Sequence, residues 1–180
     1  MRKSLILLGI LNDSDLEWML RTGVKKRVAT GDKAVAERQA LDSLFIVLTG
    51  SFGVVVGGKE RVARLLAGDI VGEMSFIDSR PPSATVVADE DSWILEIPRD
   101  QVNERLNDDP AFAARFYHAV AIFLSLRLRA TSSQLGYGQA RRAGDEEDDD
   151  EIPDDILDKL AIAGHRFAIL QERARSANAG

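Results

Sequence analysis

The chain has 180 residues, of which 45% are hydrophobic and 29% are charged, and it contains no cysteine. This composition is typical of a soluble globular domain with one core and an appendage. The lack of cysteine excludes disulfides, thiolate metal sites and a cysteine nucleophile. No apolar run approaches the roughly 20 residues of a membrane helix, so we expect no membrane contact.

The net charge of −6 is concentrated near the C-terminus. Residues 145–180 hold 11 acidic and 4 basic residues, a net charge of −7, whereas the other 144 residues carry +1. A nearly neutral body has no large basic field to attract nucleic acid, and no recognition helix with basic flanks is visible. We therefore expect no direct DNA binding.

The N-terminus has two basic residues before an apolar run, Leu5 to Leu11, as a secretory signal does. No small-residue cleavage site follows it. Instead, the polar run Asn12 to Ser14, with Glu17 three residues after its end, is a helix-start pattern whose side-chain oxygens accept hydrogen bonds from free amides. The sequence predicts a helix over residues 12–22 and a cytoplasmic protein.

The middle of the chain, Ser43 to Ile97, is rich in Val, Ile and Phe and is divided by turn signals at hairpin spacing. Gly57 and Gly58 suit a two-residue hairpin turn, which needs positive φ at both positions. Further turns are predicted at Gly50, Gly68-Asp69 and Asp89 to Asp91. This pattern predicts a compact antiparallel β unit.

A long helix is predicted over residues 110–135, because Asp109 can cap it and Pro110 can take the first helical position. Its apolar stripe either covers the β unit or forms a seam for self-association. The stripe consists of Phe112, Phe116, Val120, Phe123 and Leu124.

Residues 136–153 are predicted to be a linker, because glycines lead into seven consecutive acids, Asp145 to Glu151. An amphipathic helix follows over residues 154–176, and its apolar face either docks on its own domain or fills the groove of a partner protein. We therefore divide the chain into a domain of residues 1–135, this linker and this helix. The apolar face consists of Ile156, Leu160, Ala163, Phe167 and Leu170.

The sequence has no recognisable catalytic or metal-binding pattern. His118 and His165 lack a second ligand at a metal-binding spacing. The nucleophile elbow, the P-loop and the dinucleotide-binding glycine pattern are all missing from the sequence. We therefore expect neither an enzyme nor a metal site, and no resident cofactor.

Residues 68–88, GDIVGEMSFIDSRPPSATVVA, form the best candidate binding loop. Gly72 lets the backbone approach a ligand, and the Glu73 carboxylate can accept hydrogen bonds from sugar hydroxyls. Met74 to Asp78 can form one helical turn whose free amides favour an anion. The small residues Ser83 to Thr85 would face that anion. The same residues also suit an ordinary strand-loop-strand connection with a charged tip.

Several segments resemble, in order, the cyclic-nucleotide-binding domain family. LNDSDLEWML is similar to its opening helix, LDSLFIVLTGSFGVVV to its central hairpin, LLAGDIVGEMSFIDSRPPSATVVA to its phosphate-binding cassette, and the helix after Pro110 to its hinge and lid. The resemblance covers most of residues 8–135. It implies an α+β, mainly β, fold: an eight-stranded antiparallel jelly-roll barrel flanked by an N-terminal helix and long C-terminal helices.

The resemblance also implies roles for cassette residues. Gly72 and Glu73 would be the family's Gly-Glu pair, with the carboxylate receiving the ribose 2′-hydroxyl. The backbone amides of Met74 and Ser75 would face the cyclic phosphate.

A second group of residues would surround the rest of the ligand. Ser83 would contact the phosphate, Ala84 would pack beside it, and Thr85 would lie near the purine. On the long helix, Thr131 and Ser132 would touch the base, with a solvent-facing helix turn as the alternative.

One position departs from the family. Where its members have an arginine that pairs with the phosphate, just before the Ser-Ala-Thr run, this chain has Pro82. Without that cation the phosphate should bind about 3 to 5 kcal/mol more weakly, or roughly a hundred- to several-thousandfold in affinity. We expect a regulatory module with a degenerate cassette, weak for cAMP or cGMP, that acts as a homodimer or through a protein partner.

Two alternatives remain at this stage. One is a functional cAMP or cGMP sensor in which Arg80 replaces the missing arginine. The other is an adaptor whose final helix, Asp154 to Arg175, inserts into another protein.

Overall fold

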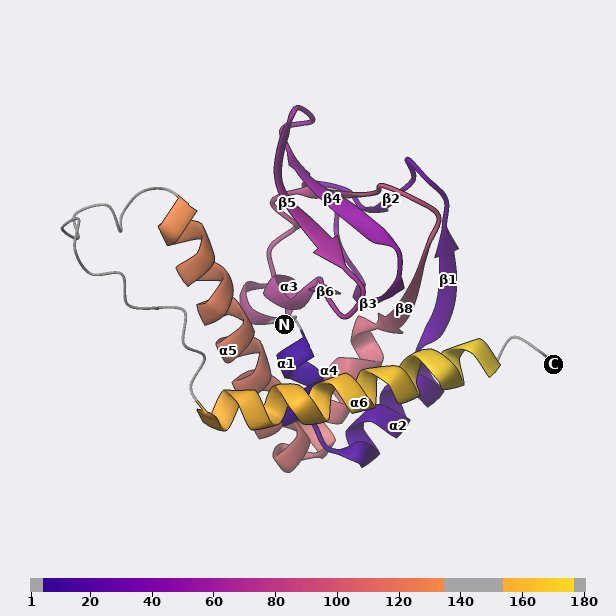
Figure 1. The fold of residues 1–180 in the computed structure, drawn as a ribbon, viewed down its shortest axis with the longest axis vertical. Helices are drawn as coiled ribbons and strands as arrows, with labels where there is room; N and C mark the ends of the chain where they lie inside the picture. Colours follow the sequence, from indigo (N-terminus) through magenta and orange to yellow (C-terminus); the bar gives the residue numbers. More distant parts are fainter. Residues whose placement is uncertain (1–4, 135–153, 177–180) are drawn as a thin grey trace.

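The computed structural model describes residues 5–134 and 154–176. Its centre is a pair of four-stranded antiparallel sheets, with strand orders β1-β8-β3-β6 and β2-β7-β4-β5 (Figure 1). The predicted mainly β jelly-roll fold with flanking helices is confirmed. The strands are β1 Val24–Val28, β2 Lys33–Val35, β3 Ser43–Thr49, β4 Ser51–Val56, β5 Glu60–Leu66, β6 Ile70–Val71, β7 Thr85–Ala88 and β8 Ser92–Pro98.

Strand β3 divides its side chains between two apolar layers, because successive residues of a strand point to opposite faces. Phe45 and Val47 pack between the two sheets. Leu44, Ile46 and Leu48 pack on the other side, against the helices. The sheet β1-β8-β3-β6 is thus buried on both faces along β3.

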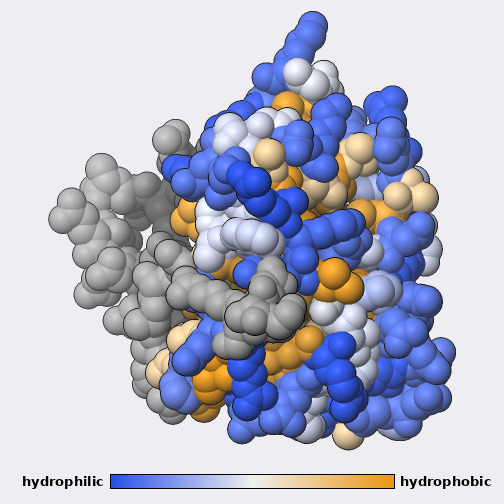
Figure 2. All heavy atoms as spheres, turned by 90° about the vertical axis from the view of Figure 1, so that its right-hand side faces the viewer, coloured by the Kyte–Doolittle hydropathy of each residue, from blue (hydrophilic) through white to orange (hydrophobic). Residues whose placement is uncertain are grey.

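The helices cover the outer face of that sheet and one end of the sandwich. In Figure 1, α5 rises beside α3, and the yellow α6 runs across α1 and α2. On the side of β1, the surface is largely hydrophilic, and hydrophobic atoms form separate patches (Figure 2). The helices are α1 Ile6–Ile10, α2 Asp13–Thr22, α3 Glu73–Asp78, α4 Arg99–Asp108, α5 Pro110–Gln134 and α6 Asp154–Ser176.

Helix α2 starts differently from the predicted pattern. Asn12 is the N-cap: its Oδ1 accepts the Asp15 amide at 2.9 Å, and the Asp15 carboxylate accepts the Asn12 amide at 3.0 Å. This reciprocal pair is a capping box. The predicted polar run therefore contains the true N-cap, Asn12, but its capping partner is Asp15, and Ser14 and Glu17 lie inside the helix.

Helix α5 begins as predicted, with Pro110 first and the Asp109 carboxylate accepting the Phe112 amide at 2.8 Å. Its stripe covers the domain, since Phe112 and Phe116 are fully buried. The segment Pro110–Arg129 has a mean hydropathy of 1.3 and satisfies the length and composition of a membrane span. This corrects the expectation that no apolar run approaches that length, although the core helix of a soluble protein satisfies the same criteria.

Helix α6 docks on its own domain, which decides between the two alternatives for its apolar face. Phe167 and Leu170 are buried in the core beneath the helices. The Arg166 guanidinium donates to the Asp13 carboxylate at 2.9 Å and to the carbonyl of Leu8 at 3.1 Å and that of Leu11, at the end of α1. Positive charge at a helix C-terminus stabilises it. The predicted linker, residues 136–153, lies outside the described residues.

Candidate functional site

Gly72 closes the turn that brings the cassette against β3. Its φ is +98°, and a Cβ at this position would lie 2.7 Å from the Ser43 carbonyl oxygen and 2.9 Å from Leu41 Cδ2. Only glycine tolerates this conformation at such a distance. The close approach at Gly72 is to the protein's own chain at β3, and the predicted approach to a ligand stays a prediction.

Glu73, the first residue of α3, is buried, with 3% of its surface exposed. Burial raises the pKa of its carboxyl group. Part of this rise is offset by the charge of Arg127 and by hydrogen bonds from the Arg127 side chain and from the backbone amides of Glu73 and Gly72. The Arg127 Nη1 lies 2.7 Å from Glu73 Oε1. The carboxylate is therefore held inside the protein by an ion pair and by the start of its own helix.

Arg127, on α5, is the site residue that sequence reasoning missed. It is 54 residues from Glu73, and its guanidinium also lies 5.3 Å from the Phe123 ring centroid. The one available signal was its position four residues before Thr131, which puts both on one helix face. A cation one turn from predicted ligand contacts is a reasonable candidate for the same site.

A second contact joins the cassette helix to α5. The rings of Phe76 and Phe116 meet edge to face, with centroids 6.0 Å apart. The guanidinium of Arg99 lies 5.2 Å from the centroid of the Phe76 ring. Helix α3 is thus attached to α5 at Glu73 and again near its middle, so a displacement of α3 would act directly on α5.

The other predicted residues of the helices are only partly described. Met74 lies on α3 and is half exposed. Ser75 lies in the same helix, but its side chain is outside the described part. Thr131 and Ser132 lie in the last turns of α5, and their side chains are outside it too. The contacts predicted for these residues stay predictions.

The Ser-Ala-Thr run leads into β7. Ser83 is exposed, and Ala84 packs against the core between the sheets. The Thr85 hydroxyl accepts a hydrogen bond from the Glu37 amide at 3.2 Å. The structure therefore joins Thr85 to the loop after β2.

Pro82 also contacts that loop. Its carbonyl oxygen accepts the Arg38 amide at 2.9 Å, and Arg38 adopts a left-handed backbone with φ of 62°. Proline offers neither a positive charge nor an N–H. The nearby Arg80 is exposed, and its amide donates to the Asp78 carboxylate at 3.0 Å.

Metal ligands do not gather anywhere in the described ranges, where no group of three His, Cys, Asp or Glu side chains could hold an ion. His118 and His165 are both exposed on helices.

Much of the chain is similar in sequence to known proteins. Residues 25–109 match the family model of the cyclic nucleotide-binding domain. The cyclic AMP receptor protein of Thermus thermophilus is 34% identical over 97 residues, which cover 52% of this chain and 43% of that protein. Glutaminase 2 of Bradyrhizobium diazoefficiens is 26% identical over 129 residues, 72% of this chain and 20% of the relative. The chain thus covers less than half the length of these curated relatives.

Solved structures share the fold. A cyclic nucleotide-binding domain from Methylobacillus flagellatus superposes with a TM-score of 0.66 at 21% identity, over 81% of this chain and 86% of that one. The catabolite activator protein of Thermus thermophilus gives 0.61 at 19% identity, over 96% and 87% of the two chains. Residues 25–109 thus match the family model of the cyclic nucleotide-binding domain, and the described chain has the fold of solved cyclic nucleotide-binding domains.

Proposed function

We propose that this chain is a non-catalytic, cytoplasmic regulatory module whose cassette binds cyclic nucleotides weakly. The observation that carries the proposal is Pro82, which stands where the family resemblance requires a cation for the phosphate. Losing one partner of a partly buried charge pair costs about 3 to 5 kcal/mol. A family site with micromolar affinity would then have a dissociation constant on the order of 1 mM.

The cation that lies beside Glu73 supports this proposal, because it is already engaged. The Arg127 guanidinium is 2.7 Å from the Glu73 carboxylate, so much of its charge is compensated. A phosphate would have to share this guanidinium with a carboxylate or displace it. Either change opposes tight binding of an anion.

The output of the module is proposed to pass through α5. This helix contacts the cassette through Arg127 and Phe116, and it also exposes Tyr117 and Leu128, with 46% and 68% of their surfaces accessible. The two exposed residues are 11 positions apart, about three helical turns, so they share one face. An apolar stripe on a long helix is suited to homodimer formation.

A protein partner could also contact the outer face of α6, because the inner face is already buried. Ile162 and Ile169 are seven residues apart on that outer face, with 47% and 36% of their surfaces exposed. We keep the division into a domain of residues 1–135, a linker and the helix of residues 154–176 as part of this proposal.

Restoring the cation tests the proposal. Pro82→Arg should raise the affinity for cAMP or cGMP at least a hundredfold, measured by isothermal titration calorimetry. Pro81→Arg is the matched control, since it adds the same charge one position earlier and should change affinity little. An equal gain from both variants, or no gain from Pro82→Arg, would contradict the assignment of this position.

The second candidate function is a competent sensor that uses Arg80. Its support is the exposed position of Arg80 in the turn that follows α3, two residues before Pro82. In that case the wild-type chain would bind a cyclic nucleotide with micromolar affinity, and the binding would depend on Arg80.

A further inference from the structure

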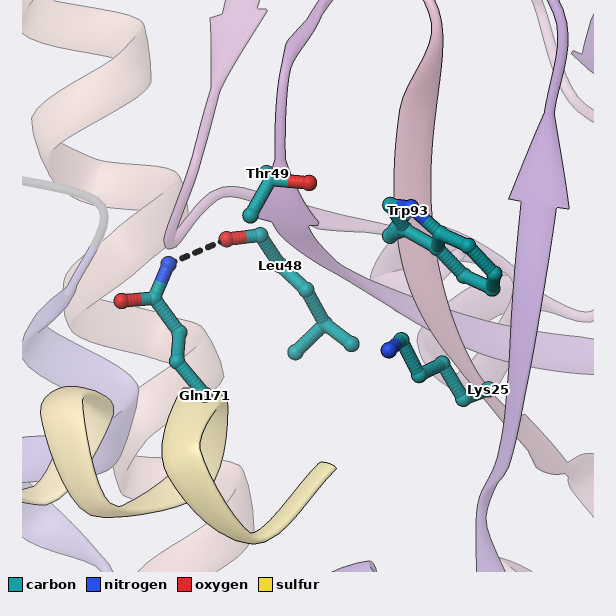
Figure 3. A pocket seen from close by; sticks show the side chains of 5 residues that line it. All are labelled: Lys25, Leu48, Thr49, Trp93 and Gln171. Carbon is teal, nitrogen blue, oxygen red and sulfur yellow. Dashed lines mark hydrogen bonds between the residues drawn. The ribbon is translucent and has the colours of Figure 1, made fainter. Parts of the chain in front are cut away.

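A cavity lies at the margin of the helix-covered face of the sheet, where β1, β3 and β8 meet the C-terminal turns of α6 (Figure 3). Its volume is about 290 Å³, close to the lower limit of small-molecule pockets. None of its residues belongs to the cassette segment, residues 65–88. The lining residues are Lys25, Leu48, Thr49, Trp93 and Gln171.

The cavity forms where the cover of helices over this sheet comes to an end. Leu48 is buried in the layer between sheet and helices, and Trp93 packs at the margin of that layer. The Gln171 amide group donates to the Leu48 carbonyl and closes one side, as Figure 3 shows. The result is a recess with apolar walls and polar groups at its rim.

The positive charge at this recess is the ammonium of Lys25, and it is not part of an ion pair among the described residues. The Lys25 Nζ lies 4.2 Å from the centroid of the Trp93 ring, a cation–π contact. The two neighbouring basic residues of β1 do form ion pairs: Lys26 lies 2.6 Å from Glu96, and Arg27 lies 2.5 Å from Asp91. Over residues 5–134 and 154–176, no carboxylate lies within ion-pair distance of Lys25.

We propose that this recess binds a small organic carboxylate with an apolar body. The ammonium of Lys25 would pair with the carboxylate, and the Thr49 hydroxyl would add a hydrogen-bonding group. The apolar body would replace water against Leu48 and the indole of Trp93. The site is independent of the cassette, and its occupancy would stabilise the docked position of α6 through Gln171.

The probe is sodium benzoate, titrated into the full chain. Binding is followed by NMR through the indole N–H signal of Trp93, which is assigned by its loss in the Trp93→Phe variant. Benzamide is its uncharged analogue, and inorganic phosphate is an anion without an apolar body. Lys25→Met retains the aliphatic stem and removes the charge. Lys26→Met is the matched control, because it removes a charge from the neighbouring residue of the same strand.

The proposal predicts a saturable shift with benzoate and a dissociation constant on the order of 1 mM. Binding should weaken roughly tenfold or more in Lys25→Met or with benzamide, remain unchanged in Lys26→Met, and be absent with phosphate. A signal that does not saturate, benzamide or phosphate binding as tightly as benzoate, or equal binding by wild type and Lys25→Met would each overturn it.

Discussion

The Arg127 guanidinium lies 2.7 Å from the Glu73 carboxylate and joins the C-terminal part of α5 to the first residue of α3. The family resemblance places the ribose contact at this carboxylate. A ligand that reached Glu73 would therefore meet a side chain of α5 at once. This ion pair and the Phe76–Phe116 ring contact are the two links between the cassette helix and α5 described above.

Removing this cation should destabilise the fold in a pH-dependent way. Arg127→Met leaves Glu73 buried beside an apolar side chain, and we expect a loss of about 1 to 2 kcal/mol at pH 7, less than for a fully enclosed pair because Arg127 reaches solvent. Burial already raises the pKa of Glu73, and the variant raises that pKa further. The loss should therefore shrink as the pH falls and the carboxyl becomes protonated.

Urea unfolding at pH 7 and pH 5 measures this effect. Arg129→Met, two residues along the same helix at an exposed position, is the control and should change stability little at either pH. A loss for Arg127→Met that is equal at both pH values would show that the ion pair is not its cause.

Asp15 should be the most important charged residue for stability. It is fully buried and accepts hydrogen bonds from Arg105 at 2.9 Å and from Arg115 at 2.8 Å, so it joins α2, α4 and α5. Burial raises the pKa of Asp15, but the hydrogen bonds from Arg115 and Asn12 and the charges of Arg115 and Arg105 lower it more, to below its ordinary value of 3.8. Asp15→Asn should cost about 3 kcal/mol.

The loss at Asp15 also shrinks as the pH falls, but at a lower pH than the loss at Glu73, because the pKa of Asp15 is lowered and that of Glu73 is raised. A carboxylate whose pKa is lowered by folding stabilises the protein at pH values above its ordinary pKa, and this stabilisation is lost as the pH falls through the pKa of the folded state. The difference in stability between wild type and Asp15→Asn should therefore vanish only in strong acid. Asp13→Asn removes an exposed carboxylate two residues away and should cost under about 1 kcal/mol. A comparable loss for both variants in chemical unfolding would refute the role of the buried cluster.

The exposed stripe of α5 should mediate self-association. Leu128→Glu places a charge on a stripe residue that is 68% exposed, so it should convert a dimer into monomers with little effect on folding. Light scattering coupled to size exclusion gives the mass directly. Glu104→Gln, on α4, is a control that should leave the mass unchanged. A wild-type chain that is monomeric at all concentrations would exclude self-association through this stripe.

Arg80 should not contribute to nucleotide binding if the cassette is degenerate. Arg80→Ala is expected to leave the affinity for cAMP and cGMP within about twofold of wild type, because the exposed side chain precedes two rigid prolines. Calorimetry on both proteins tests this. An affinity that falls tenfold or more in the variant would instead support the competent sensor.

The elements with strong local signals were predictable. Pro110 and Asp109 mark the start of α5, and the pair Gly57 and Gly58 takes φ values of 60° and 70° in the β4-β5 hairpin, as their sequence requires. These signals depend on backbone conformation and capping, which act over a few residues. Local chemistry therefore predicted the central hairpins and both long helices.

Other elements depend on contacts distant in the sequence. Strand β1, VKKRV, lies at the edge of its sheet and carries three consecutive basic residues, as edge strands often carry charges. Its sequence therefore lacks the alternation of apolar and polar residues that predicts a strand. Helix α4 buries only Val102 and Leu106 in its 10 residues, too few to produce a helical repeat. Arg127 was missed for a similar reason, since only the folded chain brings it to Glu73.

The most direct test of the central claim is calorimetry of the wild-type chain with cAMP and with cGMP. Because Pro82 supplies no positive charge to pair with the phosphate, we predict dissociation constants on the order of 1 mM or weaker for both nucleotides. A constant near 1 μM for either one would contradict it and would show that this cassette neutralises the phosphate by other means.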